Sequence, residues 1–189
     1  MSAVTIDEAW PGFGSAFTVA ELDRMPDDGH RYELLDGALL VSPRPTPVHQ
    51  YVAGRLYSLL DRVCPKGLCV IIEPALQLNL RTEFDPDLVL VPLDEVGYAK
   101  FTAPPLLAIE IRSPSTALFD LNRKKAAYQE FGVPSYWIVD PGPARPELTV
   151  FELRDGAYVT AATSTQPVTV TRPFPVTIDP AQLTEGLRR

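Results

Sequence analysis

Two carboxylates interrupt the most apolar stretches of this 189-residue chain, and they restrict how the chain can fold. Asp87 opens the apolar segment DLVLV, and Glu110 lies inside the next one, LLAIEI. An isolated charge in an apolar layer costs on the order of several kcal/mol. Lys124 follows in DLNRKKAAYQEFG, where helical spacing places it on the apolar side. Together the three side chains are groups that can hold a divalent cation and activate a water molecule.

Composition places the chain among ordinary globular proteins. Hydrophobic residues make up 46% and charged residues 22%, so we expect one domain over residues 1–189. No apolar run approaches the ~20 residues that cross a bilayer, and the start MSAVTIDEAW lacks a signal-peptide pattern. Cys64 and Cys69 have no zinc-like His or Cys cluster around them, which suits idle thiols in a reducing compartment. We therefore expect a cytoplasmic protein that does not contact a membrane.

The chain is acidic, with a net charge of -7. A large nonspecific DNA-binding surface needs Lys and Arg for its phosphate contacts, so this charge argues against such a surface. It does not exclude an enzyme that acts on nucleic acid. Part of the negative charge would lie in a metal site, where bound cations offset it.

Hydrophobic periodicity and turn residues predict an α/β fold with a mixed central sheet, flanking helices and a β-hairpin near each end. The segment over 106–139 is long enough for a parallel strand–helix–strand crossover. A Pro-rich tail with one edge strand begins at 165. The expected elements are helices over 18–25, 47–63 and from Ser115 or Thr116 to Gly132, hairpins over 31–41 and 148–161, and strands over 68–73, 75–80, 87–91, 106–111 and 135–140.

The two acids occupy different positions in their strands. Asp87 lies at a strand mouth, where a ligand can reach it, although a solvated strand-end acid has the same pattern. Asp85 is a weaker candidate that fits a loop acid. Glu110 shares a face with Ala108 in a strand expected to be buried on both sides, so it needs a partner. That partner is either a functional group or Arg112 in a structural ion pair.

Lys124 falls inside the apolar arc of its helix, and a lysine there must snorkel or meet an acid. One reading has Lys124 pointing over the sheet to Glu110, where it polarises an attacking water or stabilises developing charge. The other reading is a local ion pair with Asp120, one turn earlier on the same side.

Three further residues are candidates for the same site. Glu33 in RYELLD is an additional ligand or an exposed hairpin acid. His49, in the first turn of the helix that begins at Pro47, is a catalytic or phosphate-binding group or a helix-surface histidine. Tyr128 either donates a hydrogen bond to a carboxylate or packs in the core as an ordinary aromatic.

In this order and spacing, the motifs resemble those of the PD-(D/E)XK nuclease superfamily, and most closely the bacterial Uma-type family of candidate restriction endonucleases. The resemblance covers roughly residues 16–155, between an N-terminal arm and the Pro-rich tail. It implies a restriction-endonuclease-like core, dependence on Mg²⁺ or Mn²⁺, and hydrolysis of DNA phosphodiester bonds. It rests on the segments FTVAEL, RYELLDG, PVHQ, DPDLVLV, AIEIRSPST, DLNRKKAAY and GVPSYWIVDP.

The family pattern places its first acid on Asp87 and its second on Glu110. The superfamily lysine two residues after the second acid is Arg112 here, which stays protonated and cannot act as a base. In the Uma-type branch this lysine is moved to the following helix, which implies Lys124. Asp87, Glu110 and the backbone carbonyl of Ile111 would then bind the cation.

The alternative function is a nuclease-like fold that has lost its chemistry and acts as a binding or regulatory module. The acidic charge and Arg112 favour this module, whereas the intact acid pair favours the enzyme. Ser135 stands where the family usually has Glu, outside the expected site. A hydrolase for RNA or nucleotides is a third reading. DNA is the expected substrate, and a homodimer would supply the two sites that cutting both strands requires.

Overall fold

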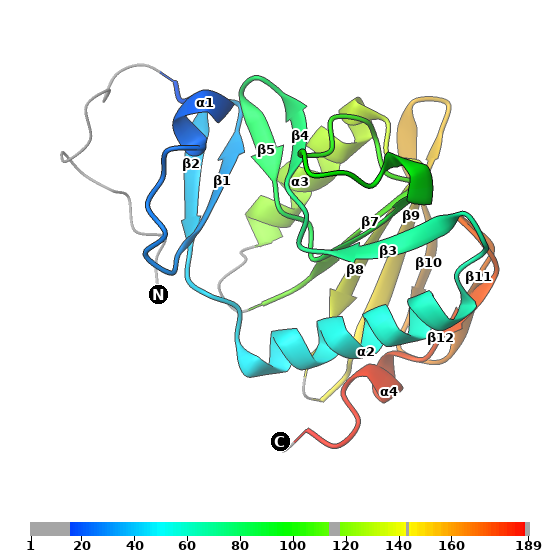
Figure 1. The fold of residues 1–189 in the computed structure, drawn as a ribbon. Coiled ribbons are helices and arrows are strands. Elements are labelled where there is room, and N and C mark those ends of the chain that lie inside the picture. The colour runs from blue at the N-terminus through cyan, green and yellow to red at the C-terminus, as the bar shows by residue number, and fades with distance from the viewer. Residues whose placement is uncertain (1–15, 114–117, 143, 188–189) are drawn as a thin grey trace.

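The computed structural model describes residues 16–113, 118–142 and 144–187, of which 118–120 are described by their backbone alone. These residues form a six-stranded sheet, a four-stranded sheet and a two-stranded pair. Figure 1 shows α2 along one side of the six-stranded sheet, with α3 and the four-stranded sheet toward the other. The expected α/β architecture with a mixed sheet is confirmed.

The six-stranded sheet carries both predicted acids. Its strands follow the order β10-β9-β8-β7-β6-β3, and β7 and β8 run parallel while the other neighbours are antiparallel. Helix α3 (Leu118–Phe131) makes the predicted crossover from β7 to β8. The strand bounds are β3 Leu68–Ile72, β6 Leu88–Pro92, β7 Leu107–Ile111, β8 Ser135–Asp140, β9 Glu147–Arg154 and β10 Ala157–Ser164. A short 3-10 helix, η1 (Leu93–Glu95), follows β6.

The four-stranded sheet contains the predicted N-terminal hairpin. Strands β1 (Arg31–Leu35) and β2 (Ala38–Ser42) are joined by Asp36 and Gly37, whose φ values of 52° and 82° fit a two-residue hairpin turn. Strand β5 (Thr82–Phe84) pairs with both β1 and β4 (Leu76–Asn79). The sequence pattern missed β5, because three residues are too few to show an alternation.

Helix α2 (Pro47–Val63) has the predicted bounds, and its apolar face packs against the six-stranded sheet. Thr46 caps its first turn by accepting a hydrogen bond from the His49 amide. A second core lies on the other face of the sheet, where Ala108 of β7 and Tyr128 of α3 meet residues of the four-stranded sheet. The alternation predicted for β7 is therefore correct: its odd-numbered residues face α2 and its even-numbered residues face α3.

Several boundaries differ from the sequence-based expectations. Helix α1 (Val19–Leu22) is shorter than predicted, although Thr18 and Glu21 do form the capping box. The expected cap of α3 at Ser115 or Thr116 lies outside the described residues, while its end at Gly132, with φ 90°, is as predicted.

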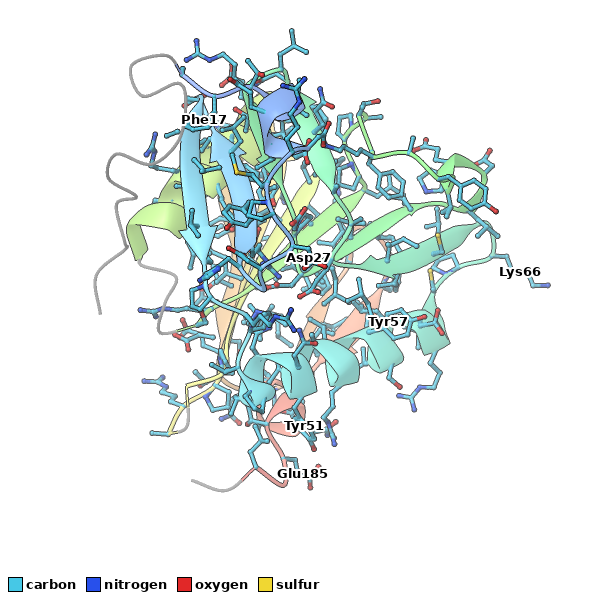
Figure 2. The ribbon with its side chains drawn as sticks, turned by 60° about the vertical axis from the view of Figure 1, so that its left-hand side comes forward. Phe17, Asp27, Tyr51, Tyr57, Lys66 and Glu185 are labelled. Atoms are coloured by element: carbon cyan, nitrogen blue, oxygen red, sulfur yellow. The ribbon has the colours of Figure 1, made fainter. Side chains whose placement is uncertain are left out.

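The tail has more structure than the single edge strand expected there. It contains β11 (Val168–Val170) paired with β12 (Val176–Ile178), followed by α4 (Pro180–Leu183). The Tyr51 hydroxyl of α2 donates to the Glu185 carbonyl at 2.7 Å, and Figure 2 shows these two residues beside each other. Among the described helices, none has the length and apolar character needed to cross a membrane.

Candidate metal and catalytic site

Lys124 is a buried cation held between two acids from different parts of the chain. Its side chain is 3% exposed. Its Nζ lies 2.7 Å from Glu33 Oε1 and 3.2 Å from Glu110 Oε1. Helix α3, strand β1 and strand β7 each supply one of these groups, so a single ion triad joins the crossover helix to both sheets.

This arrangement decides between several of the predicted alternatives. Arg112 does not pair with Glu110; its Nη1 lies 2.6 Å from Asp140 Oδ2 on the neighbouring strand, so the predicted Glu110–Arg112 ion pair is wrong. Glu33 is buried, so the exposed hairpin acid is also wrong. The side chain of Asp120 lies outside the described residues, but Lys124 does have the predicted contact with Glu110.

Tyr128 combines both of its predicted roles. Its ring is fully buried in the core between Phe84 and Tyr136. Its hydroxyl donates to Glu110 Oε1 at 2.9 Å. Because one oxygen of Glu110 accepts from Tyr128 and from Lys124, the carboxylate is held in one orientation. Burial also raises the pKa of the Tyr128 hydroxyl well above its ordinary value, so it stays a donor.

Asp87 lies directly before β6 and is 1% exposed. Its Oδ2 accepts from the Ile111 amide at 2.6 Å and lies 3.1 Å from His49 Nε2. His49 is buried at the start of α2, which makes the helix-surface alternative wrong. The carbonyl of Ile111 stays a predicted cation ligand, although the amide contact places this residue beside Asp87.

Burial and neighbouring charges give the two central acids different pKa values. Burial raises the pKa of Glu110 to about 7; the Lys124 charge opposes this rise, and the charges of Asp87 and Glu33 add to it. Burial also opposes ionisation of Asp87, but the hydrogen bond and charge of His49 and the Ile111 amide lower its pKa below the usual value. Asp87 therefore ionises more readily than Glu110, which keeps its proton to a higher pH.

The cation of the triad is fixed in its charged form. Burial lowers the pKa of Lys124, but the charges of Glu110 and Glu33, together with the Glu33 hydrogen bond, raise it above its ordinary value. An ammonium whose pKa is raised keeps its proton at neutral pH. Lys124 can therefore donate hydrogen bonds and stabilise negative charge, but it cannot remove a proton from water.

Arg31, which the sequence analysis did not single out, and Asp85, its weaker candidate, both lie against this site. Arg31, at the first position of β1, places its Nη2 2.8 Å from Glu73 Oε1 and 3.5 Å from Asp87 Oδ1. Asp85 lies in the loop between β5 and β6, as predicted, and its amide donates to Glu33 Oε1 at 3.0 Å. The only signal in the sequence was that Arg31 shares a strand face with Glu33, since residues two apart point the same way.

The donor atoms suit a hard divalent cation. Asp87 Oδ1 and His49 Nδ1 are buried without a hydrogen-bond partner among the described residues. Asp87 Oδ2 lies 2.6 Å from the amide of Ile111, the residue after Glu110, and two neighbouring carboxylates favour a dication. No group of three or more His, Cys, Asp or Glu side chains forms a ready metal site in the described part of the chain. The predicted set uses two carboxylates and a backbone carbonyl.

The mixed α/β fold is of the class found in nuclease-like proteins. A family model described as "Putative restriction endonuclease", the Uma2 family, matches residues 19–182, and the chain belongs to this family. A crystal structure described as a putative nuclease of DUF820, from Anabaena variabilis, is similar over 89% of this chain and 97% of that one. Its TM-score is 0.73 at 17% sequence identity, so the likeness is one of fold. No curated protein matches the chain.

The pKa of Asp85 provides a test of how burial and neighbouring carboxylates act on one another's ionisation at this site. Burial first, and then the negative charge of Glu33, raise the pKa of Asp85 to about 7. Because this pKa is raised in the folded state, the folded protein holds the proton more tightly than the unfolded chain does. The free energy of unfolding therefore falls as the pH rises from about 4, the pKa in the unfolded chain, to about 7, the pKa in the folded protein. We expect Asp85→Asn to raise the free energy of unfolding at pH 8 by about 1–3 kcal/mol and to change it little at pH 4.

Urea denaturation at the two pH values, with a chelator present, measures this difference. Asp94→Asn is the matched control, because Asp94 is an exposed acid on η1. An equal effect of Asp85→Asn at both pH values would show that its carboxyl is not strained by burial and repulsion.

Proposed function

We propose that this chain is a divalent-metal-dependent endonuclease that hydrolyses DNA phosphodiester bonds. The observation that carries the proposal is the buried Lys124 held against Glu110, beside an ionised Asp87 with a free oxygen. Membership of the Uma2 family supports a nuclease, and the burial of so many charges around one point supports a functional site. As part of the same proposal, the enzyme works in the cytoplasm, and a homodimer would cut both strands.

Asp87 and Glu110, with the Ile111 carbonyl, would hold a Mg²⁺ or Mn²⁺ ion. When bound, this ion would supply Lewis-acid chemistry, lowering the pKa of a water and neutralising phosphate charge. Asp87 is prepared for this role because His49 and the Ile111 amide hold Oδ2, while Oδ1 has no hydrogen-bond partner among the described residues and only a longer contact with Arg31. Glu110 is oriented by Tyr128 and Lys124.

Lys124 would act on the reacting phosphate through its charge. Because it stays protonated, its ammonium can orient a water by donating a hydrogen bond and can stabilise the negative charge that builds up on the phosphate. Glu33, on β1, accepts from the ammonium at 2.7 Å, so Glu33 is a positioning residue in this proposal. His49 Nδ1 has no partner among the described residues, and it can accept a hydrogen bond from a water when Nε2 carries the ring proton and donates to Asp87.

Asp87→Asn and Lys124→Met separate metal binding from chemistry. Asp87→Asn should weaken Mn²⁺ binding by about 100-fold or more, because it replaces an anionic ligand with a neutral one of the same shape. Lys124→Met should keep Mn²⁺ binding and lower the rate of plasmid nicking by roughly 10²–10³-fold. Calorimetric Mn²⁺ titration and plasmid nicking on the same samples measure both effects, with Asp94→Asn as the control.

Removing Lys124 alone leaves two acids unpaired, and breaking a buried ion pair costs about 3–5 kcal/mol. The double variant Glu33→Gln/Lys124→Met removes one acid with the lysine and restores the balance of charge. If this double variant folds, binds Mn²⁺ and nicks DNA like the wild type, Lys124 is only a structural ion-pair partner. Wild-type protein that binds no Mn²⁺ would instead favour a noncatalytic binding module.

The raised pKa of Glu110 predicts how metal affinity depends on pH. Below the pKa of about 7 the carboxyl holds a proton that competes with the cation. Mn²⁺ affinity should therefore rise by about tenfold per pH unit between pH 5 and 7 and level off near pH 8. Calorimetry in buffers of different ionisation enthalpy should detect the released proton. A pH-independent affinity would show that Glu110 is not a ligand.

A further inference from the structure

Arg31 lies at the boundary between the buried acids and the solvent. Its side chain is 18% exposed, whereas that of Asp87 is 2% exposed. The guanidinium contacts Asp87 Oδ1, the same oxygen that has no hydrogen-bond partner, at 3.5 Å. Its closer partner is Glu73 Oε1, at 2.8 Å, on the outer side. Arg31 therefore stands where a ligand from solvent would pass to reach Asp87.

The second cation of the site cannot take this position. Lys124 is 3% exposed and is already held by Glu33 and Glu110. Its ammonium would reach a phosphate only after that phosphate had entered the site. A guanidinium differs from an ammonium because it presents several N–H groups in a planar fork that matches two oxygens of a phosphate. Arg31 combines this planar fork with a side chain that is partly exposed to solvent.

The partners of Arg31 hold it at the rim rather than inside the site. Glu73 follows β3 and has φ 48°, a conformation that a residue with a side chain rarely adopts. Its amide donates to the Asp87 carbonyl at 3.1 Å, which ties its position to the backbone of the central acid. Gln50 of α2 reaches the same Glu73 oxygen at 3.4 Å. Glu73 and Asp87 thus contact the guanidinium, and Gln50 supports Glu73.

A dication bound to Asp87 would change the balance of forces on Arg31. Two positive groups would then compete for Asp87 Oδ1, and repulsion at this short distance would move the guanidinium away from that oxygen. Glu73 would still hold it at the rim. A phosphodiester arriving at the dication from the solvent would find the guanidinium displaced toward it, with its N–H groups available.

We propose that Arg31 is the phosphate-binding residue of this site: it pairs with Asp87 and Glu73 in the free protein and transfers to the phosphate of the bound DNA strand. The proposal rests on the metal-dependent nuclease function proposed above. It assigns Arg31 two measurable roles, as a competitor of the cation for Asp87 and as a ligand of the substrate.

Arg31→Ala separates these two roles. Losing the competitor should leave Mn²⁺ affinity unchanged or raise it several-fold, because Asp87 no longer shares its free oxygen. Losing the phosphate ligand should raise KM for DNA and lower kcat/KM by about 10²-fold or more. Arg31→Lys should keep the Mn²⁺ affinity of the wild type but recover only part of kcat/KM, since an ammonium cannot bind two oxygens in one plane.

Arg81→Ala is the matched control, because it removes the same charge at the opposite end of β1, where Arg81 donates to the Asp36 carbonyl. Its Mn²⁺ affinity and kcat/KM should equal those of the wild type. DNA binding by fluorescence anisotropy, with Mn²⁺ present and Lys124→Met as the background, adds a readout that does not need cleavage. There Arg31→Ala should weaken binding about tenfold, and Arg81→Ala should not.

The outcomes are distinguishable. If wild-type protein binds Mn²⁺ and cleaves DNA while Arg31→Ala matches Arg81→Ala in kcat/KM and anisotropy, this inference alone is wrong. If a folded Arg31→Ala or Arg31→Lys variant loses Mn²⁺ affinity, Arg31 holds Asp87 in place and does not compete with the cation. If wild-type protein binds no Mn²⁺, the nuclease proposal fails and the role of Arg31 fails with it.

Discussion

The placement of Lys124 between Glu33 and Glu110 is the constraint on which the other features of the site depend. A buried ammonium is tolerated only where acids and hydrogen bonds offset its lost hydration. Here the two acids come from β1 and β7, so the ion triad fixes α3 against both sheets at once. Removing any one of the three groups leaves a buried charge, and for that reason the site and the packing of the two sheets depend on each other.

The triad also determines the state of the metal-free site. One cation of fixed charge cannot balance all the acids that lie around it, so part of the imbalance is met by protons. Burial first, and then the charges of neighbouring carboxylates, raise the pKa values of Glu110 and Asp85, both to about 7. Arg31 supplies a further positive charge from the rim. A site that holds protons and a guanidinium near its carboxylates is suited to accept a dication in their place, as the proposed function requires.

Local patterns were sufficient to locate the principal residues. Alternation in β7 placed Glu110 on the α3 side, and helical spacing placed Lys124 on the buried side of α3; the contact between them is confirmed. The hairpin at Asp36 and Gly37 and the bounds of α2 also followed from turn and capping residues. Each of these features depends on residues a few positions apart, which is why the sequence alone could reveal them.

The features that escaped prediction depend on long-range contacts. Lys124 and Glu33 are 91 positions apart, and no local pattern indicates that they meet. Arg112 was a reasonable partner for Glu110 on one strand face, but Asp140 on the next strand holds it instead. Arg31 had no local signal of its own, and Asp85 was only a weaker candidate, until the four-stranded sheet placed them against the acids. Strand β5, which completes that sheet, is too short to have a pattern of its own.

The central claim is that Asp87 and Glu110 together hold a divalent cation beside Lys124. Anomalous diffraction from crystals soaked with Mn²⁺ tests it most directly, because the signal locates the metal without assuming any activity. We expect one strong peak within bonding distance of both carboxylates, accompanied by movement of Arg31 away from Asp87 Oδ1. A peak at other residues, or none between these two acids at saturating Mn²⁺ and pH 8, would contradict the claim.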